Sequence, residues 1–228
     1  MDKEFALSLA AKIGIDAQQV IREEVELIFL SGLFESSLAD RLVFKGGTAL
    51  RLIYDSPRFS EDLDFSLTGK IEFNEFKRLI TDITASDNRF SIKDLASKYY
   101  TYFALIGVKE PWRDFAFSLK IEISKRIMEK GQGYLNALAK SPATNISVMT
   151  RAFTFEKILT DKLRAITERK VPRDIFDIWF ICQKTSQAFT LKNFGYPKNK
   201  MRQELRKFLP RSFYPVVEEL EKFNAQRI

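Results

Sequence analysis

The sequence contains no histidine and only one cysteine, Cys182, in 228 residues. The lack of histidine excludes Ser-His-Asp and Cys-His catalytic groups, and also any metal site built on imidazole. A single cysteine excludes an intramolecular disulfide and a zinc site built on several thiolates. Any catalysis must therefore rest on carboxylates, amines, hydroxyls and backbone groups.

Long apolar runs are also missing. No uninterrupted apolar stretch approaches the roughly 20 residues that span a bilayer. The first residues, MDKEFALSLAAKIG, begin with acidic side chains and are only briefly apolar, which is unlike a signal peptide. We therefore expect a cytoplasmic protein with no membrane association.

The positive charge is concentrated in the last third of the chain. Residues 1–150 have a net charge of −1, whereas residues 151–228 have a net charge of +8. A basic surface attracts phosphate backbones, so RNA such as tRNA is one candidate partner. A helical surface that is merely solvated is the alternative.

Apolar spacing predicts a mixed first part and a helical last part. Asp16 suits the N-cap of a helix over Ala17–Leu33, and helical spacing recurs over Phe73–Thr84. From Thr154 onward we expect helices: one begins after Pro172, and two or more basic helices lie within Leu191–Phe223, broken near Gly195 and Pro210. We expect strands at Leu42–Phe44, Asp62–Phe65, Phe90–Leu95, Tyr99–Val108 and Phe115–Ser124, with Ile146–Met149 as a short edge strand.

The most informative stretch is FKGGTALRLIYDSPRFSEDLDFSL, residues 44–67. A short strand leads into Gly46-Gly47-Thr48 and then into a helical run. Backbone N–H groups at such a helix N-terminus attract phosphate oxygens, and glycine lets the backbone approach them closely. A tight turn that merely needs glycine is the alternative.

Two carboxylates follow this turn. Asp62 and Asp64 are two residues apart in a strand and therefore share one face, while Leu63 and Phe65 point to the core. Adjacent carboxylates repel each other unless a cation lies between them, and Mg²⁺ (or Mn²⁺) with a nucleotide phosphate is the natural occupant. A strand end with incidental acids is the alternative.

Together, GGTAL and RxSxDLDF resemble one family. They are similar to the AbiEii/AbiGii nucleotidyltransferase toxins, the abortive-infection toxins of bacterial type IV toxin–antitoxin pairs, within the DNA-polymerase-β-like nucleotidyltransferase superfamily. Four segments, in the same order as in the family, carry this resemblance over residues 42–179. It implies an enzyme that depends on NTP and Mg²⁺ and is paired with a cognate antitoxin. The enzyme would transfer a nucleoside monophosphate to an acceptor hydroxyl and release pyrophosphate.

The resemblance also implies roles for individual residues. Arg58 suits a triphosphate contact, and a surface ion pair with Glu61 or Asp55 is the alternative. A third metal ligand is expected on a neighbouring strand, where Glu122 lies on the polar face. The superfamily has Asp at that position, so a site with two acids remains an alternative. The residues implied at the nucleotide phosphates are Lys45, Gly46, Gly47, Thr48, Arg58, Ser60 and Lys162.

Two later segments complete the resemblance. EKILTDKLRA, residues 156–165, contains Lys162 at the position of the family lysine that reaches the triphosphate. RDIFD, residues 173–177, contains Asp174 and Asp177, which are three apart at a helix start and share a face. The catalytic acid or base of the family maps here, on either aspartate. Alternatively, these acids satisfy the N–H groups of the first turn or form an ion pair that aims Lys162.

We therefore expect an α+β protein with a small mixed sheet flanked by helices. Residues 1–150 would form the nucleotidyltransferase core, and residues 151–228 a basic helical lobe that closes the active-site cleft. The acceptor, whether a tRNA 3′ end, another RNA, a protein or the enzyme itself, does not follow from the sequence. Two alternatives stay open: a non-catalytic module that only binds nucleic acid or a partner protein, and a kinase-like enzyme that transfers the γ-phosphate.

Overall fold

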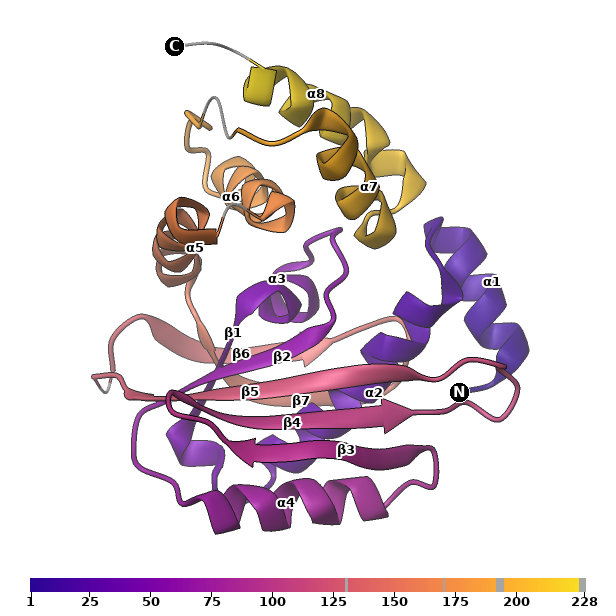
Figure 1. Cartoon of the computed structure of the whole chain (residues 1–228), viewed down its shortest axis with the longest axis vertical. Helices are drawn as coiled ribbons and strands as arrows, with labels where there is room; N and C mark the ends of the chain where they lie inside the picture. The colour runs from indigo at the N-terminus through magenta and orange to yellow at the C-terminus, as the bar shows by residue number, and fades with distance from the viewer. Residues whose placement is uncertain (130, 170, 192–194, 226–228) are drawn as a thin grey trace.

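The computed structural model describes residues 1–129, 131–169, 171–191 and 195–225. Within these ranges the α+β class is confirmed (Figure 1). The strands are β1 (Leu42–Lys45), β2 (Asp62–Leu67), β3 (Phe90–Ser97), β4 (Thr101–Val108), β5 (Phe117–Ile127), β6 (Tyr134–Lys140) and β7 (Ser147–Phe153). The helices are α1 (Lys3–Ile13), α2 (Ala17–Phe34), α3 (Gly46–Tyr54), α4 (Phe73–Ala85), α5 (Phe155–Arg169), α6 (Pro172–Lys184), α7 (Lys198–Phe208) and α8 (Tyr214–Ala225), with short 3₁₀ helices at Ala39–Arg41 and Arg211–Phe213.

The strands form one mixed sheet in the order β3-β4-β5-β2-β1-β7-β6. At its centre β2 is antiparallel to β1 and parallel to β5. In this register Asp64 lies opposite Lys45 on β1 and opposite Glu122 on β5, and Asp62 lies opposite Lys120. The side chains singled out on β2 and β5 therefore occupy neighbouring positions on one face of the sheet.

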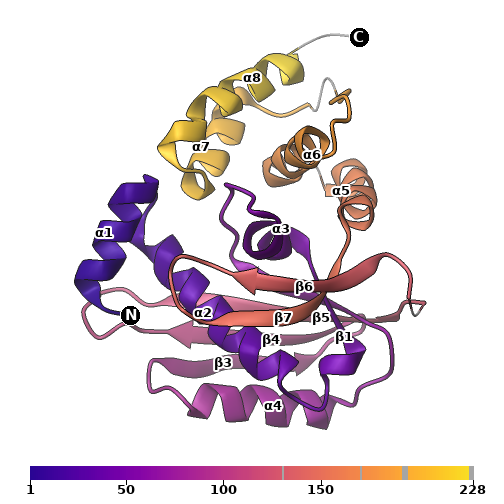
Figure 2. The same ribbon diagram turned by 180° about the vertical axis from the view of Figure 1, so that it is seen from behind.

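Helices cover both faces of the sheet. Figures 1 and 2 show α2 and α4 on one side, and α3, α5 and α6 on the other with α7 and α8 beyond them. On the first side Leu63 and Phe65 are fully buried, as their alternation with the aspartates predicted. A second apolar cluster joins Val43 and Leu50 to the C-terminal helices. This cluster packs α5 and α6 beside the start of α3.

Local signals set most of the helix boundaries. The Asp16 carboxylate accepts a hydrogen bond of 2.7 Å from the Gln18 N–H at the start of α2, as predicted. Pro172 occupies the first turn of α6, where its missing N–H has no cost. Helix α7 confirms one of the basic helices expected within Leu191–Phe223, whereas α8 carries three glutamates and one lysine and is not basic. Residues 192–194 of that expected segment lie outside the described residues.

One prediction about the sheet is wrong. The segment predicted as an edge strand, Ile146–Met149, overlaps the start of β7, which lies between β1 and β6 and is not an edge strand. The edge strand beside β7 is β6, whose side chains are mostly exposed and show no clear apolar alternation. Residue 150, the expected boundary, falls inside β7, and the helices begin at Phe155. Among the helices of the described segments, none combines the length and apolar character needed to cross a bilayer.

Candidate functional site

Two adjoining cavities of about 270 and 80 Å³ lie between the start of α3, β2 and the facing sides of α5 and α6. Both are lined by Gly47, Asp64, Lys162 and Arg169. The structure therefore brings three of the four motif segments to one place, and the fourth, through Asp174, lines the smaller cavity. The predicted residues that line either cavity are Lys45, Gly46, Gly47, Arg58, Ser60, Asp62, Asp64, Lys162 and Asp174, whereas Thr48, Glu122 and Asp177 line neither.

The glycine pair makes room for two charged side chains. Gly46 has φ +83°, and a Cβ there would lie 2.7 Å from the Asp64 Oδ2. A Cβ on Gly47 would lie 2.2 Å from an Arg58 guanidinium nitrogen. The first helical turn of α3 receives no side-chain cap, because the N-cap residue is Lys45. The N–H groups at the start of α3 therefore face a cavity that glycine keeps open.

Thr48 ties the helix to the acidic strand. Its side chain is fully buried, and its hydroxyl donates to the Asp62 carbonyl oxygen at 2.5 Å. This hydrogen bond fixes the start of α3 against the start of β2. The contact between this hydroxyl and a phosphate stays a prediction, and the structure places the hydroxyl on the backbone of β2.

Asp62 and Asp64 bring two carboxylates together at the smaller cavity. Burial and the neighbouring Asp62 carboxylate raise the pKa of Asp64, although the charges of Lys45 and Lys120 oppose this shift. A cation bound between the two carboxylates would relieve their repulsion. Carboxylate oxygens are the ligands that Mg²⁺ prefers, so this pair fits a divalent cation.

Lys120 contacts Glu122, the residue expected as the third metal ligand. Its ammonium is 2.9 Å from Asp62 and 3.3 Å from Glu122, so it bridges the two carboxylates. Burial lowers the pKa of Lys120, but its hydrogen bond to Asp62 and the charges of Asp62 and Glu122 together outweigh this effect and raise it. Within the described part of the chain, no three carboxylate or thiol side chains are gathered closely enough to hold a metal ion. Glu122 as a ligand stays a prediction, and it requires Lys120 to move.

Replacing Lys120 with Met should strengthen Mn²⁺ binding by about tenfold, because the internal cation would no longer compete for Asp62 and Glu122. Calorimetric titration with Mn²⁺ alone measures this change without any need for activity. Lys93→Met, on the exposed face of β3, is the matched control and should leave the affinity unchanged. Unchanged or weaker binding in a folded Lys120→Met variant would contradict the competition.

An alternating chain of five charged side chains connects the loop before β2 to α5 and α6. We call it the ion-pair chain; its members, in order, are Arg58, Asp177, Lys162, Asp174 and Arg169. Arg58 holds Asp177 with two hydrogen bonds of 2.6 and 2.8 Å. The Lys162 ammonium lies 2.6 Å from Asp177 and 2.7 Å from Asp174. Arg169 then holds the far side of Asp174 at 2.9 and 3.0 Å.

The ion-pair chain settles two of the alternatives. Arg58 does not form a surface pair with Glu61 or Asp55; its side chain is 2% exposed and is paired with Asp177. The expected salt bridge between Lys162 and an aspartate of α6 is confirmed for both aspartates. Burial alone would raise the pKa of Asp177, but the charges of Arg58 and Lys162 hold it below its usual value. The pKa of Asp174 is lowered in the same way, against burial, by Lys162 and Arg169.

A model of the family "Nucleotidyl transferase AbiEii toxin, Type IV TA system" matches residues 28–221. The match spans the glycine turn, the Asp62/Asp64 pair and the ion-pair chain. The chain belongs to the AbiEii family of nucleotidyltransferase toxins. Membership of a toxin–antitoxin family implies a cognate antitoxin.

Solved structures share the fold of this AbiEii-family protein. JHP933 from Helicobacter pylori aligns with a TM-score of 0.60 and 22% identity over 91% of this chain and 95% of that chain. A putative nucleotidyltransferase from H. pylori aligns with a TM-score of 0.60 and 21% identity, over 93% of this chain and 100% of that chain. MenT4, a nucleotidyltransferase toxin from Mycobacterium tuberculosis, aligns with a TM-score of 0.53 and 16% identity, over 82% of this chain and 63% of that chain. Among curated proteins, no sequence matches this chain.

Three cations of this AbiEii-family site were not predicted. Lys120 shares the polar face of its strand with Glu122, and Arg169 lies seven residues after Lys162, which is the helical spacing that could have identified it. Arg22, a buried residue on α2, donates to the carbonyl oxygens of Glu61 at 3.3 Å and Ser118 at 2.7 Å. Arg22 therefore clamps the starts of β2 and β5 together, for which the sequence offers no local signal.

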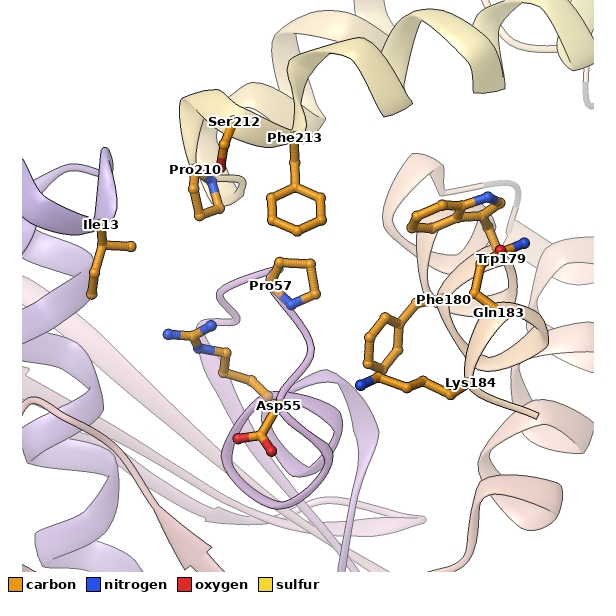
Figure 3. A pocket seen from close by; sticks show the side chains of 11 residues that line it. Ile13, Asp55, Pro57, Trp179, Phe180, Gln183, Lys184, Pro210, Ser212 and Phe213 are labelled. Atoms are coloured by element: carbon orange, nitrogen blue, oxygen red, sulfur yellow. The ribbon is translucent and has the colours of Figure 1, made fainter. Parts of the chain in front are cut away.

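The loop between α3 and β2 also lines a larger pocket, of about 550 Å³. Figure 3 shows the rings of Pro57, Phe180 and Phe213 pointing into it, with the Asp55 carboxylate nearby. Pro57 lines this pocket, whereas the next residue, Arg58, lines the smaller cavity of the site. Consecutive residues of this loop thus contact the apolar C-terminal helices and the ion-pair chain of the AbiEii-family site.

Proposed function

We propose that this AbiEii-family protein is a metal-dependent nucleotidyltransferase that transfers a nucleoside monophosphate from an NTP to an acceptor hydroxyl and releases pyrophosphate. One observation carries the proposal: Gly47 at the uncapped start of α3, the Asp62/Asp64 pair and Lys162 all line the smaller cavity. A phosphate site and a cation site are thus adjacent, as phosphoryl-transfer chemistry requires. This arrangement supports an enzyme over a module that only binds.

Different residues of the cavity would contact different parts of a bound nucleotide. The N–H groups of Gly46 and Gly47 would hold phosphate oxygens, with Lys45 beside them. The Lys162 ammonium has three donors, and Asp174 and Asp177 use two, so one remains for the triphosphate. Phe153 and Ile158 form an apolar wall that suits the nucleoside.

Asp62 and Asp64 would hold Mg²⁺ or Mn²⁺, with Glu122 as a third ligand once Lys120 moves. A bound Mg²⁺ would neutralise phosphate charge and lower the pKa of the attacking hydroxyl. The protein itself fixes the geometry, because Thr48 and Arg22 lock β2 against α3 and β5. Such positioning supplies much of the acceleration in this reaction class.

The acceptor is proposed to be RNA, such as a tRNA 3′ end, attracted by the basic C-terminal third. Several cations of that region already lie in ion pairs, among them Arg173 with Glu204 and Arg202 with Glu221. The attraction would therefore come from the other lysines and arginines of α7 and its flanks. Binding that is set by phosphate charge must weaken steeply as salt rises.

The test is incubation of the purified protein with Mg²⁺, total RNA and each of the four NTPs labelled at the α-phosphate, followed by a denaturing gel. We expect label on RNA and pyrophosphate in solution. Diphosphate in place of pyrophosphate would indicate a kinase-like transfer of the γ-phosphate. Label on protein alone would keep the chemistry and change the acceptor. No label on any acceptor from a folded protein would favour the binding module.

A further inference from the structure

Arg169 differs from the other cations of the ion-pair chain in its freedom to move. Its side chain is 60% exposed, whereas those of Arg58 and Lys162 are 2% and 11% exposed. It lies at the last turn of α5 and lines both cavities of the site. Arg58 is fixed in the interior, but Arg169 can leave its partner without opening a void in the core.

The contacts of Asp174 show what would happen if Arg169 moved. The Asp174 Oδ1 accepts from Lys162 at 2.7 Å and from Arg169 at 3.0 Å. The Oδ2 accepts from the Arg169 Nε at 2.9 Å. Loss of Arg169 would therefore leave Oδ1 held by Lys162 and would release Oδ2. Asp177 has no such freedom, because Arg58 and Lys162 hold both its oxygens in the interior.

Charge also favours an exchange of partners. The ion-pair chain holds three cations and two carboxylates, so it carries one excess positive charge, and Arg169 is its terminal member. A polyphosphate in the cavity offers several anionic oxygens where Asp174 offers two. A guanidinium binds phosphate oxygens in the same two-pronged geometry in which it binds a carboxylate.

We propose that Arg169 is a polyphosphate-binding residue that exchanges Asp174 for the phosphates of the bound nucleotide, and that this exchange frees the Asp174 Oδ2 for the acceptor. The proposal rests on the nucleotidyltransferase function and adds an order of events to it. Asp174 becomes able to accept a hydrogen bond from an acceptor hydroxyl only after the nucleotide has bound. Of the two aspartates of α6, it assigns the contact with the acceptor to Asp174, which lines the smaller cavity.

The test is calorimetric binding of inorganic tripolyphosphate, of an NTP and of the matching nucleoside monophosphate, without an acceptor. Arg169→Gln should weaken tripolyphosphate and NTP binding at least about tenfold, because charge-assisted hydrogen bonds are lost, and should change monophosphate binding less than about twofold. Asp174→Asn should act in the opposite direction and tighten tripolyphosphate binding several-fold, because the competing carboxylate is gone. A merely structural role for Arg169 would not produce effects of opposite sign.

Arg164→Gln, on the exposed side of the same helix, is the matched control and should bind all three ligands like the wild type. If the wild type binds tripolyphosphate and Arg169→Gln binds it equally well, the exchange is overturned and the nucleotidyltransferase function stands. Weaker tripolyphosphate binding by Asp174→Asn would also overturn the exchange. If the wild type binds neither tripolyphosphate nor NTP, the nucleotide site itself is refuted, and the exchange with it.

Discussion

Replacing Arg58 with Met is expected to lower the free energy of unfolding by about 3–5 kcal/mol, the usual cost of removing one partner from a buried ion pair. Asp177 is fully buried and would keep only the shared Lys162 ammonium. For a protein of this size the loss corresponds to a fall in melting temperature of roughly 6–20 °C, which scanning calorimetry measures directly. Urea denaturation provides a second value.

A matched exposed pair serves as the control for Arg58. Lys70→Met also removes the cation of an ion pair, with Glu72 at 2.7 Å, but these side chains are 78% and 63% exposed, so the melting temperature should stay close to that of the wild type. Combining Arg58→Met with Asp177→Asn should destabilise less than the sum of the two single changes, because the stranded charge is removed. Strict additivity, or a stability of Arg58→Met within about 1 kcal/mol of the wild type, would contradict the buried pair.

Changing both Asp62 and Asp64 to Asn is expected to reduce nucleotide transfer by at least about 10³-fold. A catalytic metal ion stabilises the transition state by several kcal/mol, and each 1.36 kcal/mol corresponds to a factor of about ten in rate. The neutral amides keep the shape of the aspartates but not their charge, so they cannot hold Mg²⁺ in the same way. The measurement is the rate of label incorporation at saturating NTP and Mg²⁺.

The same double variant should remain folded. Burial and the Asp62 carboxylate already raise the pKa of Asp64, so the paired charges cost stability and their removal relieves repulsion. We therefore expect a melting temperature at or above that of the wild type. Asp94→Asn, an exposed change on β3, controls for the loss of a carboxylate from the sheet and should keep full activity. Transfer at the wild-type rate by the Asp62/Asp64 variant would refute the catalytic assignment.

Strong local patterns made much of the fold predictable. The Asp16 cap and its apolar stripe identify α2, and the alternation around Asp62 identifies the strand with its buried face. β6 was missed because its own sequence, YLNALAK, shows no clear alternation of apolar and polar residues. For the same reason β7 was assigned to the edge, since its partner β6 was not identified.

The site was less predictable, because its contacts join residues that are distant in sequence. The motifs identified Arg58 and Asp177, but the pairing between them depends on how α6 packs beside β1 and α3 through Val43 and Leu50. The reason for the glycine pair was likewise hidden, because it lies in the close approach of Asp64 and Arg58. Lys120 looked like an ordinary exposed lysine until its strand was placed next to Asp62.

The ion-pair chain also sets when the site can exist during synthesis. Arg58 and Asp177 are separated by 119 positions in the sequence, and the ion-pair chain needs both residues. A chain still on the ribosome therefore has all seven strands of its sheet before it has a finished site, because α6 follows the last of them. A transcript cut short before α6 yields a polypeptide with the acidic strand and the glycine turn but no completed cleft. In a family of toxins, this order means that an interrupted translation product lacks the complete site.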